Sequence, residues 1–344
     1  MKNFKIISLV VLALVLISSE CGRPDMLVIN KVNEDGSVNR KLVITYDEDE
    51  FDLDDMQVPV DSSWTLEKTI EVSEKGDSLW TITAEKYFAS VEDLNYAYNN
   101  HKGTNDKMTR SAVFEKHFKW FNTVYFFSEN VEKAIDGYPP EDFFGEEYLD
   151  LFYMPEKIFN DFRYGEDSLR YKAMVDTLEE KKEIWFGRSL VKAAITELDS
   201  LIQLSGGSKI NISDIREKEE EMAEIIFEIE DIETVIDTLL GKGYYIENQV
   251  TIDSALKLIE KKLDVAMSTN TYLVQTKMPG ELVGTNGYID TEGAILWEVN
   301  SDVIFTRDYS MWARSTVSNL WAWIVSGLFV IFVVLSIVLR RRRS

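Results

Sequence analysis

The chain has 344 residues, of which 45% are hydrophobic and 12% aromatic, and its net charge is −23. This apolar content excludes a disordered chain, because it is enough to fill one or two buried cores. Most of the negative charge lies between residues 21 and 320, which hold 59 acidic and 31 basic side chains. Such a surface repels nucleic acid and anionic headgroups, so DNA binding and peripheral membrane docking are disfavoured.

The N-terminus has the layout of a secretory signal. Lys2 and Lys5 precede an apolar run from Ile6 to Ile17, and Ser18, Ser19 and Glu20 follow it. Twelve helical residues reach only about 18 Å, which is short of the ~30 Å hydrocarbon core of a bilayer. We therefore expect residues 1–20 to be a signal peptide and not a membrane span.

Cys21 is the only cysteine, so no intrachain disulfide can form. Its place after the apolar run resembles a bacterial lipoprotein signal, in which the cysteine becomes the lipidated first residue. Ser18 and Glu20 depart from that pattern, so a lipidated Cys21 and an ordinary cleaved signal both stay open. An acyl chain would have to share its bilayer with any spanning helix of the chain, which points to the cytoplasmic membrane.

Residues 21–137 are predicted to be rich in β-structure. A first hairpin, 26–46, turns at Asp35-Gly36, and a second pairs residues 64–72 with 79–88. Ser90 and Asp93 resemble a capping box that opens a short helix toward Asn100. The aromatic segment 116–131 fits both a strand and a helix, and we favour a strand because aromatic residues suit a pleated surface.

Residues 138–268 change to helical periodicity and form an acidic helical insertion. Three apolar stripes run along residues 190–202, 215–239 and 252–263, and the second has heptad spacing up to Gly241 and Gly243. We expect these helices to pack on one another as an antiparallel bundle. Pairing of the heptads with a partner's coiled coil is the alternative.

Strands resume in residues 269–314, with predicted strands at 272–277, 282–288, 294–299 and 302–313. Pro279-Gly280 and Asn286-Gly287 are predicted turns in which Gly accepts a positive φ. The fold class is therefore α+β: an antiparallel sheet built from N- and C-terminal strands, a helical insertion, and one C-terminal transmembrane helix.

The C-terminal segment 315–339 carries no charged side chain. Within it, Trp321 to Leu339 gives roughly 28 Å of helix, which is long enough to span a bilayer. Arg314 precedes this segment directly. Trp321 and Trp323 occupy the place of an interfacial aromatic belt. The tail, 340–344, opens with four arginines that mark the cytoplasmic side: Arg340, Arg341, Arg342 and Arg343. A buried core helix is the alternative.

The motifs Met278-Pro279-Gly280, Trp297-Glu298-Val299 and Asn319-Leu320-Trp321-Ala322-Trp323 resemble a group of uncharacterised membrane-anchored proteins of Bacteroidetes-type bacteria. Lys119-Trp120-Phe121-Asn122-Thr123 looks like a strand motif of that group. More distantly, the group is similar to LppM-like lipoproteins. The resemblance implies a β-rich envelope domain, with polar-lipid binding by analogy, and it supplies no catalytic residues.

Signatures of common enzyme and metal sites are missing from the sequence. His101 and His117 lack the spacing and the companions of a zinc site, and no GxSxG, P-loop or GxGxxG is present. The acidic run 47–55 could bind Ca²⁺, but it lacks the glycine-centred loop of an EF-hand, and a solvated loop is preferred. We expect no cofactor and no bound metal.

These patterns predict a non-enzymatic, single-pass protein of the bacterial cytoplasmic membrane. Its ectodomain would lie outside the cytoplasm, and it would bind a protein partner through the helical insertion or organise an envelope complex. A polar-lipid-binding module is the alternative. A hydrolase that uses paired carboxylates is a third, which 60 acidic residues make hard to judge from sequence.

Overall fold

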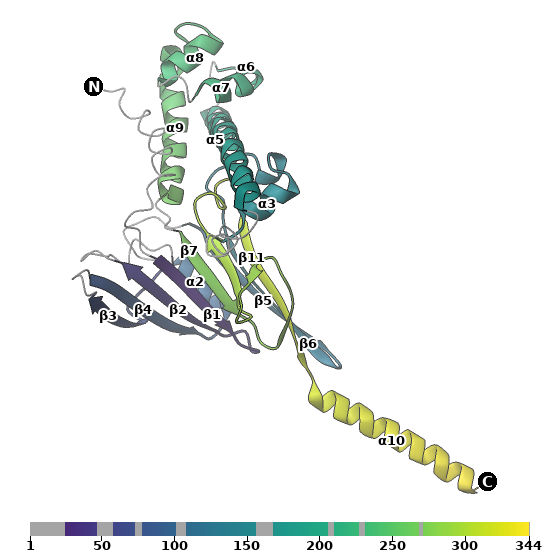
Figure 1. Cartoon of the computed structure of the whole chain (residues 1–344). Coiled ribbons are helices and arrows are strands. Elements are labelled where there is room, and N and C mark those ends of the chain that lie inside the picture. The colour runs from purple at the N-terminus through teal and green to yellow at the C-terminus, as the bar shows by residue number, and fades with distance from the viewer. Residues whose placement is uncertain are drawn as a thin grey trace.

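The computed structural model describes residues 25–46, 58–72, 78–100, 108–155, 168–205, 210–226, 231–267 and 271–343. Two β-sheets carry a group of helices at one end and a single projecting helix at the other (Figure 1). The fold class is mixed α+β, as predicted. The predicted signal peptide, Cys21, the acidic run 47–55 and His101 lie outside the described residues.

The larger sheet has seven strands in the order β3-β4-β2-β1-β7-β10-β9. Their bounds are β1 (Asp25–Val32), β2 (Val38–Tyr46), β3 (Thr65–Val72), β4 (Ser78–Phe88), β7 (Tyr272–Lys277), β9 (Tyr288–Ile289) and β10 (Ile295–Val299). Both predicted hairpins are present, and Gly36 has φ +90° in the first turn. β1 and β7 pair in parallel, so the prediction of an antiparallel sheet is wrong at this junction.

The smaller sheet has four strands in the order β5-β6-β11-β8. They are β5 (Arg110–Lys119), β6 (Asn122–Val131), β8 (Glu281–Thr285) and β11 (Tyr309–Ser318). The single shared sheet that we expected is thus two sheets, each of which combines N- and C-terminal strands. β11 starts later and ends later than the predicted 302–313, because residues 301–307 form turns and bends.

The aromatic segment 116–131 is extended, as favoured, but it contains a hairpin turn. β5 ends at Lys119, Trp120 and Phe121 make the turn, and β6 begins at Asn122. Helix α2 (Val91–Asn99) packs beside β5, where the Asn95 side chain donates to Ala112 O at 2.9 Å. Its predicted cap is confirmed, since Ser90 Oγ accepts from Asp93 N at 3.2 Å.

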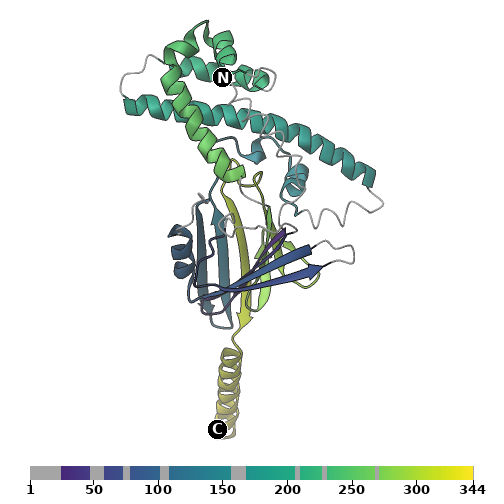
Figure 2. The same ribbon diagram turned by 90° about the vertical axis from the view of Figure 1, so that its left-hand side faces the viewer.

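The helices between the two sets of strands form what we call the helical lobe. Its elements are the 3-10 turn η2 (Pro140–Asp142) and helices α3 (Glu146–Phe152), α5 (Ser168–Ser205), α6 (Ile212–Glu217), α7 (Glu219–Ile225), α8 (Ile232–Leu240) and α9 (Tyr244–Met267). α5 alone is about 57 Å long at ~1.5 Å per residue. In Figures 1 and 2, the lobe stands at the end of the sheets opposite helix α10 (Leu320–Arg343).

The predicted heptad helix is broken into α6, α7 and α8. α6 ends at Glu217 with Lys218 as its C-cap, and α8 begins separately where the Asp231 side chain accepts a hydrogen bond from Thr234 N at 3.0 Å. An N-cap begins a new helix and cannot sit inside a continuous one. The third stripe on α9 is confirmed, with Ile252, Ile259 and Leu263 buried.

The inward faces of the two sheets share one apolar core, and the base of the helical lobe joins it. Trp185 of α5 is fully buried and packs edge-on against Phe305 at 5.4 Å between ring centroids. A second core lies within the lobe itself, between α5, α6, α7, α8 and α9. The lobe is therefore rooted in the sheets but stabilised by its own apolar contacts.

Glycines in the C-terminal strands have two different roles. Gly280 has φ +76°, as the predicted Pro279-Gly280 turn requires. Gly287 has no positive φ, so that part of the prediction is wrong. A Cβ at Gly287 would lie 2.6 Å from side-chain atoms of Ile295 and Trp297, and close approach explains the glycine. Ile295, Trp297 and Val299 all point into the core, as their alternation predicts.

Candidate membrane-proximal site

Helix α10 is long and apolar enough to cross a membrane. Almost none of its surface is covered by the rest of the protein, which excludes the alternative of a buried core helix. The predicted flanking residues lie at its two ends. Trp321 and Trp323 are in its first turn, and Arg340, Arg341, Arg342 and Arg343 are in its last.

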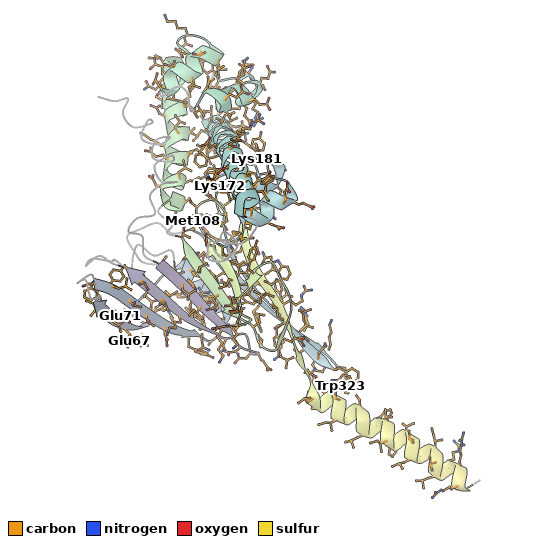
Figure 3. The ribbon with its side chains drawn as sticks, in the orientation of Figure 1. Glu67, Glu71, Met108, Lys172, Lys181 and Trp323 are labelled. Atoms are coloured by element: carbon orange, nitrogen blue, oxygen red, sulfur yellow. The ribbon has the colours of Figure 1, made fainter. Side chains whose placement is uncertain are left out.

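Five aromatic side chains gather where the smaller sheet meets α10; we call them the aromatic collar: Phe118, Trp120, Phe121, Trp321 and Trp323. The ring centroids are 6.1 Å apart for Phe118 and Trp321, 5.3 Å for Trp120 and Trp321, and 4.3 Å for Phe121 and Trp323. Each of the five stays 41–57% exposed despite these contacts. Figure 3 shows Trp323 at this junction.

Asn319 fixes the start of α10 to the β5–β6 hairpin. Its side-chain amide donates to Lys119 O at 2.8 Å, and its backbone N–H donates to Phe121 O at 2.9 Å. Thr123 Oγ1 donates to Asn319 Oδ1 at 3.0 Å. Since β11 pairs with β6 as far as Ser318, only this one residue separates the sheet from the helix.

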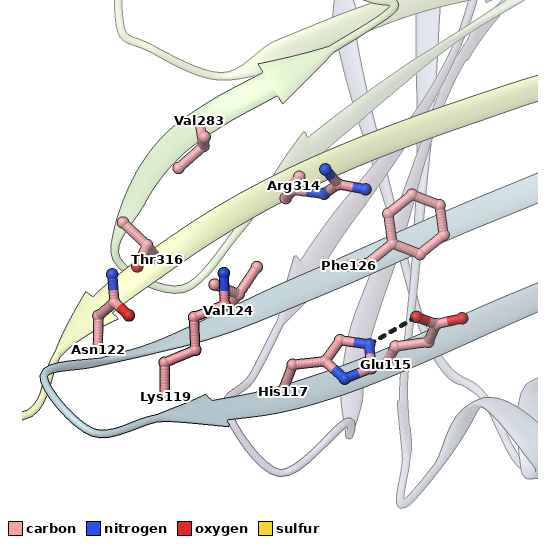
Figure 4. A pocket seen from close by; sticks show the side chains of 9 residues that line it. All are labelled: Glu115, His117, Lys119, Asn122, Val124, Phe126, Val283, Arg314 and Thr316. Atoms are coloured by element: carbon pink, nitrogen blue, oxygen red, sulfur yellow. Dashed lines mark hydrogen bonds and ion pairs between the residues drawn. The ribbon is translucent and has the colours of Figure 1, made fainter.

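A shallow hollow of about 410 Å³ lies on the outer face of the smaller sheet, close to the collar (Figure 4). It is lined by side chains of β5, β6, β8 and β11: Glu115, His117, Lys119, Asn122, Val124, Phe126, Val283, Arg314 and Thr316. His117 Nε2 is 2.9 Å from Glu115 Oε2, and the Arg314 guanidinium lies 5.9 Å from the Phe126 ring centroid.

The hollow combines cations with apolar side chains. Among the described residues, neither Lys119 nor Arg314 has an ion-pair partner, whereas Glu115 is occupied by His117. Val124, Phe126 and Val283 supply an apolar floor and wall. This arrangement suits an anionic group attached to an apolar body, since a guanidinium and an ammonium both bind phosphate or carboxylate oxygens.

A second polar group, which we call the buried cluster, lies between the two sheets and α2. Its members come from six elements: Asn30, Arg40, Tyr98, Arg110, Glu129, Tyr272 and Thr276. Arg40 Nη2 is 2.6 Å from Glu129 Oε2, and Arg40 Nε donates to Asn30 Oδ1 at 2.8 Å. Tyr98 OH donates to Glu129 Oε1 at 2.6 Å, and Arg110 donates to the Tyr272 hydroxyl.

The buried cluster holds two guanidinium groups and one carboxylate. Burial by itself would raise the pKa of Glu129, but the charges of Arg40 and Arg110 outweigh it and hold that pKa below its usual range. Burial raises the pKa of Tyr98 and of Tyr272. At neutral pH the cluster therefore contains a carboxylate, two cations and neutral phenols, an arrangement that joins the sheets.

Arg110 is incompletely satisfied within the described part of the chain. Its Nε and Nη1 are buried without a hydrogen-bond partner there, and Nη1 is 3.8 Å from Glu129 Oε1. Its side chain is only 1% exposed. Of the two cations that face Glu129, Arg110 therefore makes the longer and weaker contact with the carboxylate.

Sequence reasoning missed the buried cluster, although one signal was available. Arg40 has the same strand phase as Val38, Leu42 and Ile44, which are buried, and Glu129 has the phase of Phe127. A charged residue at an inward position of a strand requires a partner of opposite charge. The partner itself could not be identified, because Arg40 and Glu129 are 89 residues apart.

Two of the other candidate metal-binding features, the acidic run 47–55 and His101, lie outside the described residues. Within the ranges that the structure describes, no three metal-ligating side chains come together. His117 belongs to the hollow and not to a zinc site.

The far end of the helical lobe exposes aliphatic side chains. Ile246 and Val250 are 62% and 83% exposed and lie one helical turn apart on α9. Leu204, near the end of α5, is 84% exposed. Because these three side chains are so exposed, they do not contribute to the lobe's own apolar core.

Comparison with known proteins adds no relative. No protein-family model, curated protein sequence or solved structure matches this chain. The resemblance to the Bacteroidetes-type envelope group therefore stays a hypothesis, and function has to be argued from the geometry.

Proposed function

We propose that this protein is a non-enzymatic binding protein of the bacterial cell envelope, held in the cytoplasmic membrane by α10, that recognises a protein partner with its helical lobe. The observation that carries the proposal is the position of the lobe. It has its own apolar core, stands at the opposite end of the sheets from α10, and exposes Ile246 and Val250 there. A helical lobe in this position presents a binding surface far from the bilayer.

Site-specific photo-crosslinking tests this function in the full chain and its native membrane. A photoreactive residue replaces Val250 or, in separate variants, Ile246; the control replaces Glu67, which is exposed on β3. We expect a discrete protein adduct from the α9 positions and none from Glu67. Equal labelling at all three positions, or no adduct at either α9 position, would count against the lobe as the binding surface.

The proposed topology places the sheets and the lobe outside the cytoplasm and the tail that starts at Arg340 inside it. The support is the cluster of four arginines after the apolar run, since such clusters stay on the cytoplasmic side. A reporter fused after Ser344 should be active only in the cytoplasm, and one fused near Gly206 only outside. Incorporation of labelled fatty acid, lost in Cys21→Ser, would establish Cys21 as a second anchor.

The hollow on the smaller sheet favours a second function, the binding of a polar lipid. Lys119 and Arg314 face an apolar wall within reach of the membrane end of the sheet. Native mass spectrometry of the full chain released from bilayers containing phosphatidylglycerol should show retained anionic lipid. Arg314→Gln with Lys119→Gln should reduce it, whereas Lys133→Gln, an exposed change at the other end of the sheet, should not. Unchanged retention would remove this candidate.

A further inference from the structure

The tip of the β5–β6 hairpin has an unusual composition for a turn in water. Tight turns are dominated by Gly, Asn, Asp, Pro and Ser, and two-residue hairpin turns favour Asn-Gly. Here Trp120 and Phe121 form the turn, and neither has a positive φ. Neither Trp nor Phe is a residue type that favours the backbone conformation of a tight turn, so their presence here needs an explanation outside the turn itself.

The tip also stays exposed after all contacts within the protein are made. Phe118, Trp120 and Phe121 are 57%, 48% and 41% exposed, and they form one apolar surface at the end of the hairpin. Lys119, between them, is exposed as well. Indole and phenyl rings flanked by a lysine are the side chains that prefer the headgroup layer of a bilayer.

The depth of the tip follows from its contacts with α10. Trp120 Nε1 donates to Ser326 Oγ at 2.8 Å. Ser326 lies six residues beyond Leu320, which is roughly 9 Å along the helix axis at ~1.5 Å per residue. The Trp120 indole therefore reaches the second turn of α10, inside the apolar part of the helix and beyond the backbone positions of Trp321 and Trp323 along its axis.

We propose that the β5–β6 hairpin is a second membrane contact: its tip enters the interfacial layer of the bilayer that α10 crosses, and the lipid headgroup and upper acyl region cover the aromatic collar. The inference rests on α10 being a membrane span. Its occupant is the membrane and not another protein, because the tip is continuous with α10 and is fixed to it by Asn319 and Ser326. The lipid covers the collar, and the Ser326 hydroxyl already has the Trp120 indole as its partner within the protein.

The orientation of the protein follows from the two contacts together. A single helix leaves a domain free to tilt over the membrane, whereas a helix and a hairpin tip that enter the same surface define an angle. Because the lobe and α10 lie at opposite ends of the sheets (Figure 2), the two contacts would hold the smaller sheet upright with the lobe pointing away from the bilayer.

Spin-label accessibility in lipid nanodiscs tests the contact on the full chain. In a Cys21→Ser background, which removes the only cysteine, single cysteines replace Phe121 at the tip, Ser111 on the same hairpin, and Val330 in α10. Ser111 is an exposed, matched control, seven residues and roughly 23 Å from Phe118 along β5 at ~3.3 Å per residue. The measurement is the ratio of collision rates with oxygen and with a water-soluble nickel complex.

We expect the ratio at position 121 to be several-fold higher than at position 111 and below that at position 330. A ratio at 121 equal to that at 111, with 330 still in lipid, would overturn the hairpin contact and leave the anchor intact. Water-like ratios at both 121 and 330 would overturn the anchor, and the inference with it. A second label at Phe118, on the strand and not in the turn, should agree with position 121; a water-like ratio there contradicts the proposal even if the Phe121 variant is poorly folded.

Discussion

Replacing Glu129 by Gln should destabilise the protein more than any other conservative change in the smaller sheet. The amide keeps the shape of the side chain but removes the carboxylate that, within the described ranges, faces Arg40 and Arg110, whose side chains are 0% and 1% exposed. Leaving buried charges without their partner costs about 3–5 kcal/mol. A typical domain has only about 5–15 kcal/mol of stability, so the loss would be a large fraction of it.

Urea unfolding of the detergent-solubilised chain, followed by tryptophan fluorescence, measures this loss. The matched control is Glu132→Gln, three residues further on and exposed, which should change the unfolding free energy by less than about 0.5 kcal/mol. If Glu129→Gln lies within 0.5 kcal/mol of that control, the charges of the buried cluster do not stabilise the fold in the way argued here.

A comparison of the wild type with Glu129→Gln also gives a pH dependence of stability with a defined sign. The pKa of Glu129 is lower in the folded state than its ordinary value of 4.5. Its contribution is therefore fully present above pH 4.5 and disappears as the pH falls through the lowered pKa. The difference in unfolding free energy between the wild type and Glu129→Gln should be constant near neutral pH and should shrink below pH 4.5. A difference that grows on acidification would refute the assignment.

Three further pairs of variants have defined outcomes. Arg110→Met should cost less than Arg40→Met, because Arg110 has two buried nitrogens without a partner in the described part of the chain and its removal leaves the close Arg40–Glu129 pair, at 2.6 Å, in place. Equal losses in urea unfolding would contradict this. Gly287→Ser should cost about 1–3 kcal/mol by overpacking against Ile295 and Trp297. Gly145→Ser, at an N-cap with open space around it, should be neutral or slightly stabilising in the same assay. Ser90→Ala should lose about 1 kcal/mol through the missing cap of α2, while Ser111→Ala should not.

Local rules predicted the local features of the fold well. The Asp35-Gly36 turn, the Ser90 cap and the inward face of β10 each depend on a few adjacent residues, and the structure confirms them. The turn at Trp120-Phe121 was missed because it contains no residue that signals a turn. Its aromatic side chains contact Trp321 and Trp323 of α10, which lie about 200 residues further along the chain, so nothing near the turn indicates them.

Features that depend on distant pairing could not be predicted. β1 and β7 are neighbours in the larger sheet although about 240 residues separate them, and nothing in either strand states that they pair in parallel. The heptads around Met222 gave the right apolar positions, since Ile215, Met222 and Ile236 are all buried. They gave the wrong continuity, because this part of the chain contributes to the core of the lobe as three short helices, α6, α7 and α8, and not as one long helix.

The pairing of early with late strands also sets the order in which the protein can fold. β1 lacks its β7 neighbour, and β6 lacks its β11 neighbour, until residues 272–318 have been synthesised. Two strand edges therefore wait unpaired through the synthesis of the whole helical insertion, and contacts of such high sequence separation form slowly. Both sheets are completed only by the strands that directly precede α10, so closure of the β-structure depends on the last part of the chain before that apolar helix.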